Sequence, residues 1–352
     1  MFSPSEFTVT FAYQSQNIPF SDWISLLTVC LAPLLAHIMS GAPEPIVLTD
    51  DPPHWSDRLY LWNPMTITWR YFIIVDRRMR ATNWTPRSMA DINAVFWTDS
   101  GWRGCDYLEE NPNIICTKLP SGTAIPWISS SAAKTLIVTL QGFQIVYLCM
   151  LALLERTFQI SIRSIFFAIS FISLLRLPAA PWLTEEFGYC NTSKQDSEDS
   201  CWQQSDPTAP PSPPASSSLR PQSSRGALVL RAYFLLWNTC SLALNILFWF
   251  CPGPLCPVCR SSTAFLRQIV FLAIIIGKTT LFYLYIVTGQ TASPILPCQN
   301  ARWYKAYTWL LVVLSLALLF VSVLETRRDE DGGYTSVPDI PACRYKKVWE
   351  TA

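Results

Sequence analysis

Lys278 lies near the middle of a long apolar stretch, residues 268–288, and is its only charged residue. About 20 apolar residues are enough for a helix to cross the ~30 Å hydrocarbon core of a bilayer. A charged side chain at that depth costs about 2.5–3.5 kcal/mol on insertion scales, and such residues often have a function. We interpret Lys278 as a structural lysine, as a group that binds an anionic or carbonyl-bearing solute, or as a side chain that snorkels to the surface.

Other polar residues occur at helical spacing on the apolar segments. Asn238 and Asn245 are seven residues apart, so a helix places both on one face, and Tyr285 shares a helical face with Lys278. Apart from Asp22, the first residue of the first segment, no Asp or Glu lies inside the apolar segments, so Lys278 has no acidic partner at its own depth. We therefore predict that Lys278, Asn238, Asn245 and Tyr285 bind a ligand, with the two amides close to the ammonium group.

A cysteine cluster follows the segment that contains Asn238. Cys251, Cys256 and Cys259 resemble part of a zinc site, but a fourth ligand is needed and the only histidines are His37 and His54. A redox pair is an alternative, and so is palmitoylation of cysteines next to a membrane. We favour acylation or a structural role, and expect neither a metal nor another cofactor.

Catalytic motifs are missing from the sequence. It has no glycine-rich phosphate loop, no Gly-x-Ser-x-Gly elbow and no His-Glu-x-x-His pair. With two histidines in the chain, general acid–base catalysis by imidazole is a poor explanation. The sequence therefore favours a protein that is not an enzyme.

Composition indicates the class of protein. Half of the residues are hydrophobic, mean hydropathy is +0.24, and charged residues make up 14% against about 25% in soluble domains. The net charge of +1 gives no reason to expect a nucleic acid as partner. We expect an all-α integral membrane protein with about six transmembrane helices, at residues 22–39, 134–154, 158–177, 229–250, 268–288 and 306–324.

Two of these segments are less regular than the others. The first contains Pro33 and His37, and a re-entrant segment or a signal anchor is an alternative to a full span. The third contains Arg163 and Arg176 near its ends, which we expect to snorkel to the lipid headgroups.

The chain divides into six regions by composition. A mixed, Trp-rich polar loop follows the first span, and a Pro/Ser-rich run from Pro207 reads as a linker because it cannot form a core. The expected regions are 1–39, the N-terminus and first span; 40–133, the polar loop; 134–177, a helical hairpin; 178–228, a loop with the linker; 229–324, three spans; and 325–352, a disordered tail.

Cysteines and glycosylation signals indicate which loops lie outside. The Lys and Arg residues near the spans are almost evenly divided between the two faces, so they do not set the orientation. Local cysteine pairs and Asn-x-Ser/Thr signals in two loops on the same face suit an oxidising exterior. We predict disulfides Cys105–Cys116 and Cys190–Cys201, glycans at Asn83 and Asn191, and cytosolic termini. The expected location is the plasma membrane or a membrane of the secretory pathway.

One segment of the polar loop does not suit this orientation. Asn63 and Pro64 look like the N-cap and first residue of a helix. That helix places apolar residues on one face and Arg70, Arg77 and Arg80 on the other. We interpret it as a basic amphipathic helix on a cytosolic leaflet, or as a surface helix packed on the loop region.

The same segment carries a family resemblance. Trp62-Asn-Pro-Met-Thr66, Trp69-Arg-Tyr-Phe72 and Asp76-Arg-Arg78 resemble uncharacterised multi-pass membrane proteins of filamentous fungi. The resemblance implies a membrane location, and some such proteins accompany secondary-metabolite pathways.

Three functions are consistent with the sequence. The first is a non-enzymatic accessory or scaffolding protein that contacts the lipid bilayer and, through its loop and tail, protein partners. The second is a small-solute transporter or channel-like protein that uses Lys278. The third is a membrane enzyme that acts on a lipophilic substrate through Cys251, Cys256 and Cys259.

Overall fold

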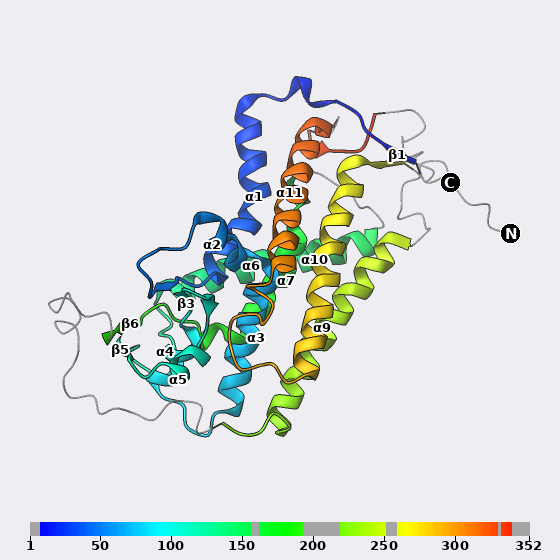
Figure 1. The fold of residues 1–352 in the computed structure, drawn as a ribbon. Helices are drawn as coiled ribbons and strands as arrows, with labels where there is room; N and C mark the ends of the chain where they lie inside the picture. The colour runs from blue at the N-terminus through cyan, green and yellow to red at the C-terminus, as the bar shows by residue number, and fades with distance from the viewer. Residues whose placement is uncertain (1–7, 156–161, 193–218, 251–258, 330–331, 340–352) are drawn as a thin grey trace.

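The chain folds into a bundle of long helices with a smaller mixed region at one end (Figure 1). The computed structural model describes residues 8–155, 162–192, 219–250, 259–329 and 332–339. It is mostly helical, as predicted, and its strands are short. The helices are α1 Phe20–Gly41, α2 Trp55–Trp62, α3 Pro64–Arg80, α4 Pro86–Asn93, α5 Asp106–Glu110, α6 Ser130–Glu155, α7 Phe167–Ser173, α9 Arg225–Phe250, α10 Ser262–Val287 and α11 Arg302–Glu325, with 3₁₀ turns η1 Ser15–Asn17, η2 Ile162–Ser164 and η3 Leu174–Trp182.

Five helical stretches of the described chain are long and apolar enough to cross a membrane. They are Phe20–Gly41, Ile162–Trp182, Arg225–Ala243, Ser262–Val287 and Arg302–Glu325. They correspond to the first, third, fourth, fifth and sixth predicted segments. The second lies in α6, which forms a continuous helix but is not among the five, so the predicted number of six is not confirmed. In Figure 1, α6 runs crosswise to the steep helices α1, α10 and α11.

The third segment is broken rather than continuous. It passes from η2 through α7 into η3, where Pro178 and Pro181 prevent regular α-helical hydrogen bonding. The prediction that both of its arginines snorkel is wrong for Arg176, which is 2% exposed. Its guanidinium donates to Thr135 Oγ1 at 2.8 Å and to the Ser40 carbonyl, because α6 and the end of α1 enclose it.

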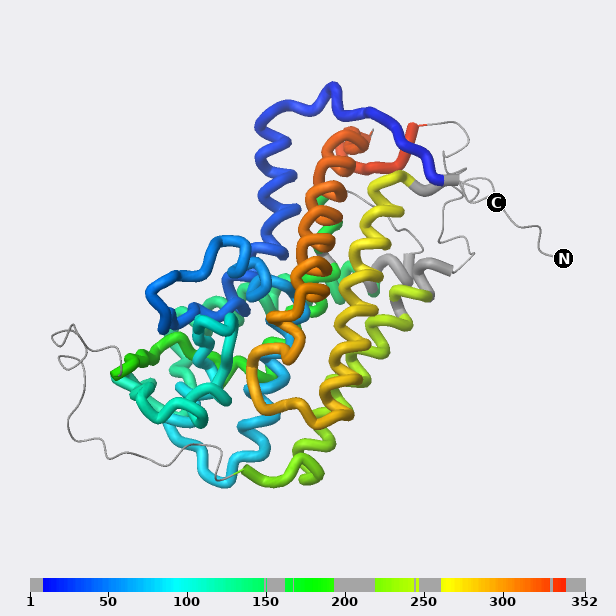
Figure 2. Tube along the Cα trace, in the orientation of Figure 1, coloured from blue at the N-terminus to red at the C-terminus, as the bar shows by residue number. Residues whose placement is uncertain are grey.

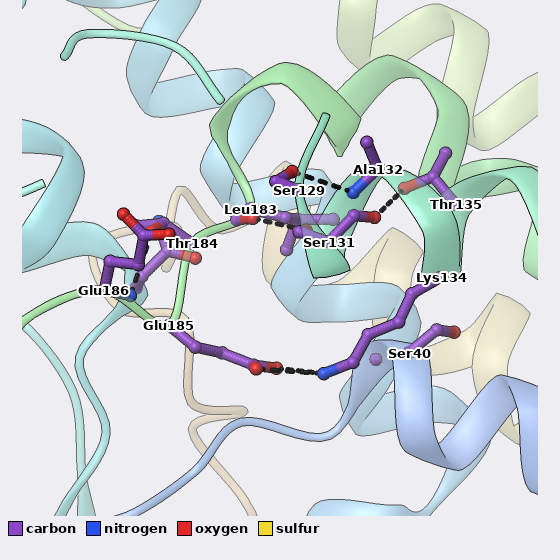
Figure 3. A network of polar contacts seen from close by, with 12 residues as sticks. Ser40, Ser129, Ser131, Ala132, Lys134, Thr135, Leu183, Thr184, Glu185 and Glu186 are labelled. Atoms are coloured by element: carbon purple, nitrogen blue, oxygen red, sulfur yellow. Dashed lines mark hydrogen bonds and ion pairs between the residues drawn. The ribbon is translucent and has the colours of Figure 1, made fainter. Parts of the chain in front are cut away.

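Polar contacts at the start of α6 hold this region together (Figure 3). Ser131 donates from its Oγ to the Leu183 carbonyl at 2.7 Å, and Lys134 forms an ion pair with Glu185 at 2.9 Å. Arg176 also donates to the Ser131 carbonyl, in the same first turn of α6, at 3.3 Å. These bonds fix the beginning of α6 against the chain that follows η3.

Helix α3 occupies the centre of the bundle and is buried along most of its length. Asn63 caps it, since its Oδ1 accepts from the Met65 amide at 3.0 Å, and Pro64 is its first residue, as predicted. Both predicted surface locations are wrong, because α3 packs against α1, α9, α10 and η3. Arg70, 3% exposed, donates to the Gly41 carbonyl at 2.9 Å and to Asn93 Oδ1 at 3.1 Å.

A buried carboxylate anchors the C-terminal half of α3. Asp76 is fully buried and accepts from Arg80 at 3.1 Å and from Arg231 of α9 at 3.3 Å. Arg231 also donates to Thr291 Oγ1 in the loop after α10, at 3.1 Å. Two arginines on one carboxylate satisfy the charges that burial would otherwise leave unpaired. The cluster thus joins α3, α9 and the loop between α10 and α11.

Residues 8–10, the 259–262 segment and the end of α11 meet at the upper end of the bundle in Figure 1, around the β1 label. Strands β1 (Thr8–Thr10) and β7 (Cys259–Ser261) pair in parallel. The Glu325 carboxylate accepts from the first amides of α10, Ser262 at 3.0 Å and Thr263 at 2.7 Å, where a negative charge suits the helix dipole. These contacts hold the first described residues, the start of α10 and the end of α11 together at one end of the bundle (Figure 2).

The loops expected on the opposite face also meet. Strand β5 (Ile114–Lys118) pairs antiparallel with β6 (Gly188–Asn191), which joins the 40–133 and 178–228 regions. A second sheet has the order β2 (Ile46–Val47), β3 (Phe96–Thr98), β4 (Gly101–Arg103). The loop region is therefore a folded element with a small core of Ala94, Phe96 and Ile114.

Part of the predicted disordered tail is ordered. Strand β8 (Arg327–Arg328) pairs with β9 (Tyr334–Thr335), and Tyr334 donates to Asp22 near the start of α1. The remaining tail from residue 340 and most of the 203–225 linker lie outside the described residues.

The predicted Cys105–Cys116 disulfide is wrong. Both cysteines are free: Cys105 is buried and donates to the Ala292 carbonyl at 3.4 Å, whereas Cys116 lies in β5. Cys105 and Cys116 therefore lie in different parts of the fold, although they are only eleven residues apart in sequence. Within the described chain no disulfide joins two cysteines. Cys190 is not among the free cysteines, and Cys201 lies outside the described residues, so that pair stays a prediction.

We expect Cys105 and Cys116 to be alkylated in the denatured, unreduced protein, because neither is in a disulfide. Peptide mass spectrometry after iodoacetamide treatment without reductant measures this directly. A linked peptide containing both residues would contradict the structure.

We expect Asp76→Asn to destabilise the protein by about 3–5 kcal/mol, since it leaves two buried arginines without a carboxylate. Chemical unfolding of the purified protein in detergent measures the loss. Glu110→Gln is the matched control, because it breaks an ion pair with Arg103 whose glutamate side chain is 59% exposed. Such pairs contribute about 0–1 kcal/mol. Equal effects of the two substitutions would show that the Asp76 cluster does not support the fold.

Candidate binding site between two apolar cores

The bundle contains two apolar cores, one above the other along the helices. The first surrounds α3, and its aromatic centre is formed by Trp69, Phe72, Phe234 and Phe282, whose rings meet at 5.1–6.1 Å. The second joins α1, α7, α10 and α11 and contains Leu26, Ile169, Phe271, Ile274 and Leu318. Helices α10 and α11 contribute residues to both cores.

A layer of polar side chains lies where the cores meet. On α10, Ile274 belongs to the second core and Leu281 to the first, and Lys278 lies between them. On α1, Cys30 belongs to the second core and Gly41 lies against Ile67 of the first, with His37 between.

Two further helices contribute to this layer. Ser173 ends α7, between Ile172 of the second core and Leu175 of the first. Asn238 lies one turn beyond Phe234 on α9, beside α10. Thr239 Oγ1 and Tyr283 Oη meet at 2.8 Å, so Asn238 lies opposite the turn of α10 that follows Lys278. We call this set the polar layer; its members, all 2% exposed or less, are His37, Ser170, Ser173, Asn238 and Lys278.

One hydrogen bond within the polar layer defines the tautomer of His37. His37 Nδ1 and Ser173 Oγ are 2.6 Å apart, and Ser173 donates its hydroxyl hydrogen to the Ile169 carbonyl at 2.8 Å. Because the serine has one hydrogen to give, Nδ1 of His37 carries the proton and donates to Ser173. Nε2 of the neutral ring is therefore an acceptor with a free lone pair.

Most other polar atoms of the layer lack partners. Nε2 of His37, Oγ of Ser170, both amide atoms of Asn238 and Nζ of Lys278 make no hydrogen bond within the described chain. Buried polar groups are nearly always paired, since an unpaired group costs about 1–3 kcal/mol. Several unpaired groups at one level of a bundle indicate a site that has a use other than stability.

The electrostatic environment of the layer is positive. Lys278 and Arg176 both lie within electrostatic reach of His37. The N-terminus of α3 lies at the same level, since a Cβ at Gly277 would contact Met65 Sδ at 3.2 Å. The positive end of that helix dipole adds to the charge. No carboxylate of the described residues pairs with Lys278; Asp76 and Glu325 have other partners.

The structure brings together only part of the predicted ligand-binding set. Lys278 and Asn238 are both fully buried and lie on the neighbouring helices α10 and α9, and no hydrogen bond joins them. Asn245 lies elsewhere, because its carbonyl accepts from Gln268 Nε2 at 2.9 Å. Tyr285 packs in the first core, 5.9 Å from the Trp69 ring, about two helical turns beyond Lys278.

The sequence analysis did not predict Ser170, Ser173 or His37 as site residues, and only His37 had a signal in the sequence. The available signal was a histidine within an apolar segment, which has the same significance as the lysine in residues 268–288.

The other predicted sites are less defined. Cys251 and Cys256 lie outside the described residues, and Cys259 belongs to β7. No group of metal-ligating side chains occurs in the part of the chain that the structure describes. Asn83 is exposed after α3 and Asn191 is half-buried in β6, on the side of the folded loops, and their glycosylation stays a prediction.

A surface pocket in the loop region offers no reactive thiol. Arg77, Trp84, Asp91 and Cys105 line it. Burial raises the pKa of the Cys105 thiol to about 12 despite the nearby Arg77. The thiol is therefore protonated and weakly nucleophilic at neutral pH.

A comparison of the chain with protein-family models, with curated proteins and with solved structures finds no match. The resemblance of residues 62–78 to fungal multi-pass membrane proteins stays a prediction.

We expect Lys278→Met to stabilise the protein by about 1–3 kcal/mol, because it removes an unpaired buried cation and keeps a side chain of similar length. Chemical unfolding in detergent tests this. A loss of stability would show that the ammonium group has a structural role, the first interpretation of Lys278.

Proposed function

We propose that the chain is a multi-pass membrane protein that binds a small solute at the polar layer and passes it across the bilayer. The observation that carries the proposal is the combination of Lys278 of α10, Asn238 of α9 and His37 of α1, three fully buried side chains with unpaired polar atoms, of which Lys278 and His37 lie within electrostatic reach of each other. Intramembrane ionisable residues typically mark solute or ion pathways.

The outer faces of the helices support a membrane location. On α11, Val313, Leu316 and Phe320 are more than half exposed, and on α6 so are Leu140 and Phe143. Large apolar side chains that are exposed along whole helices suit contact with lipid. Trp303 and Trp309 near the start of α11 suit the membrane–water boundary.

The structure corresponds to a closed form of such a protein. His37, Asn238 and Lys278 are all fully buried, so a solute reaches them only after the helices separate. Two irregular segments adjoin the layer: α1 contains Pro33, and the 3₁₀ segment η3 contains Pro178 and Pro181. Prolines weaken helical hydrogen bonding, and kinks of this kind are suitable hinges.

An accessory or scaffolding role is the second proposal. Its specific support is the pair Trp127 and Ile128 in the loop before α6, which are 97% and 98% exposed. Large apolar side chains that are exposed side by side suit contact with a protein partner. A link to secondary metabolism rests on the fungal resemblance alone.

We expect Lys278→Met and Asn238→Leu to reduce solute flux in proteoliposomes about 10–100-fold, because each removes a polar contact worth about 1–3 kcal/mol. Flux is measured for a panel of a small carboxylate, chloride and a small neutral amide. Asn245→Leu and Tyr285→Phe are matched controls on the same two helices, and they should retain flux.

Two results would contradict the proposed function. One is a flux in the Lys278→Met protein that equals the wild-type flux for every solute of the panel that passes. The other is an equal loss in the control variants, which would assign the effect to general disruption of the bundle.

A further inference from the structure

We propose that a cleft in the folded loop region binds a free α-amino acid with an apolar side chain, with the ammonium group at Asp91 and Glu109 and the carboxylate at Arg77. The cleft is separate from the polar layer, so this inference goes beyond the proposed function and does not rest on it.

The cleft lies where the C-terminal end of α3 meets α4 and α5, in the lower part of Figure 1. Its volume is about 470 Å³, including its opening to solvent, which is within the range of about 300–1,000 Å³ for small-molecule sites. Arg77 of α3, Asp91 of α4 and Glu109 of α5 all line this one cleft. Three charged side chains that are distant in sequence are thus available to a single ligand.

Asp91 offers one free carboxylate oxygen. The residue is 8% exposed, and Oδ1 accepts both of its hydrogen bonds, from Arg87 Nε at 2.8 Å and from Tyr189 Oη at 2.6 Å. Oδ2 accepts no hydrogen bond from any described residue. Burial raises the pKa of Asp91, so its ionised form gains stability from a further cationic donor. An ammonium group in the cleft is such a donor.

Glu109 adds a second negative charge. It is exposed and lines the cleft, and no Lys or Arg of the described residues forms an ion pair with it. The next residue, Glu110, is different, because it pairs with Arg103 at 2.5 Å. An ammonium group has three N–H donors, so it can bind two carboxylates at once.

Arg77 supplies the opposite charge. Its Nη2 donates to the Ala292 carbonyl, a neutral acceptor, and no carboxylate of the described residues forms an ion pair with it. Nε is buried without a hydrogen-bond partner, and Nη1 makes no hydrogen bond within the described chain. A guanidinium has five N–H donors, so Arg77 still has donors for a carboxylate.

The balance of charges in the cleft selects a zwitterion. Arg77 is an unpaired cation and Glu109 an unpaired anion, whereas the charge of Asp91 is already balanced by Arg87. A simple amine would leave Arg77 without a counter-ion, and a simple carboxylic acid would leave Glu109 without one. A molecule that carries both an ammonium and a carboxylate group pairs with both.

The remaining walls of the cleft are apolar. Trp84, Ile92 and Leu108 line it. The Trp84 ring is held in place, since its Nε1 donates to the Thr123 carbonyl at 3.0 Å and the Arg78 guanidinium lies 5.6 Å from its centroid. Apolar walls favour an apolar side chain on the amino acid.

Binding of leucine, methionine and phenylalanine to the purified full-length protein in detergent tests the inference. We expect at least one of the three, at saturation, to raise the thermal midpoint by about 2 °C or more. The matching amine without the carboxylate and the matching acid without the amino group should have no effect at the same concentration, because each leaves one charge of the cleft unpaired.

Two variants of α5 measure the contribution of the cleft. Glu109→Gln should weaken binding of the amino acid about tenfold or more in calorimetric titration, since it removes a charged contact. Glu109 is exposed and unpaired within the described chain, so the substitution leaves the described contacts intact. Glu110→Gln is the matched control outside the cleft, and it should bind with wild-type affinity.

Several results would overturn the inference. One is the absence of stabilisation by all three amino acids, and another is equal stabilisation by the matching amine or acid, and neither needs a variant. Equal affinity of Glu109→Gln and the wild type would also overturn it. Lys278→Met should retain binding; a loss there would assign the amino acid to the polar layer and not to the cleft. Solute flux does not enter these measurements, so the inference and the proposed function fail independently.

Discussion

The burial of α3 depends on the neutralisation of Asp76 by Arg80 and Arg231. A helix with this many charged residues cannot occupy the centre of an apolar bundle unless each charge is paired or hydrogen-bonded. Arg70 donates to the carbonyl of Gly41 and to the side chain of Asn93, and Asp76 accepts from two arginines. Because Arg231 comes from α9 and also reaches the loop after α10, the same cluster fixes the position of α3 between its neighbours.

The position of α3 in turn determines where the polar layer lies. The helix lies between α1, α9 and α10 and begins at Pro64, and beyond its start α10 and α11 contribute Ile274 and Leu318 to the second core. Polar residues on several helices lie at this boundary, and the positive end of α3 lies at the same level. Local preference and global packing disagree here, since apolar residues would fill the level more favourably. Such disagreements are typical of functional sites.

Sequence reasoning recovered the long apolar helices and the start of α3 but not the environment of α3. Apolar residues on one face and arginines on the other are equally consistent with a helix on a lipid surface and with a helix whose arginines are paired in a core. The partner Arg231 is 155 residues away from Asp76, so no local pattern shows the pair. The same limit explains the cysteines: Cys105 and Cys116 are close in sequence, but Cys105 turns toward Ala292.

The sequence by itself determined the apolar helices, the cap at Asn63 and Pro64, and the presence of a lysine without an acid in its segment. These features depend on hydrophobic periodicity and on capping, which act over a few residues. The tertiary structure decided that Lys278 and Asn238 are fully buried without partners whereas Asn245 and Tyr285 have other contacts, and that His37 lies within electrostatic reach of Lys278. Those outcomes depend on how helices that are far apart in the chain are rotated and shifted against one another, because only contact between their faces determines which polar groups meet.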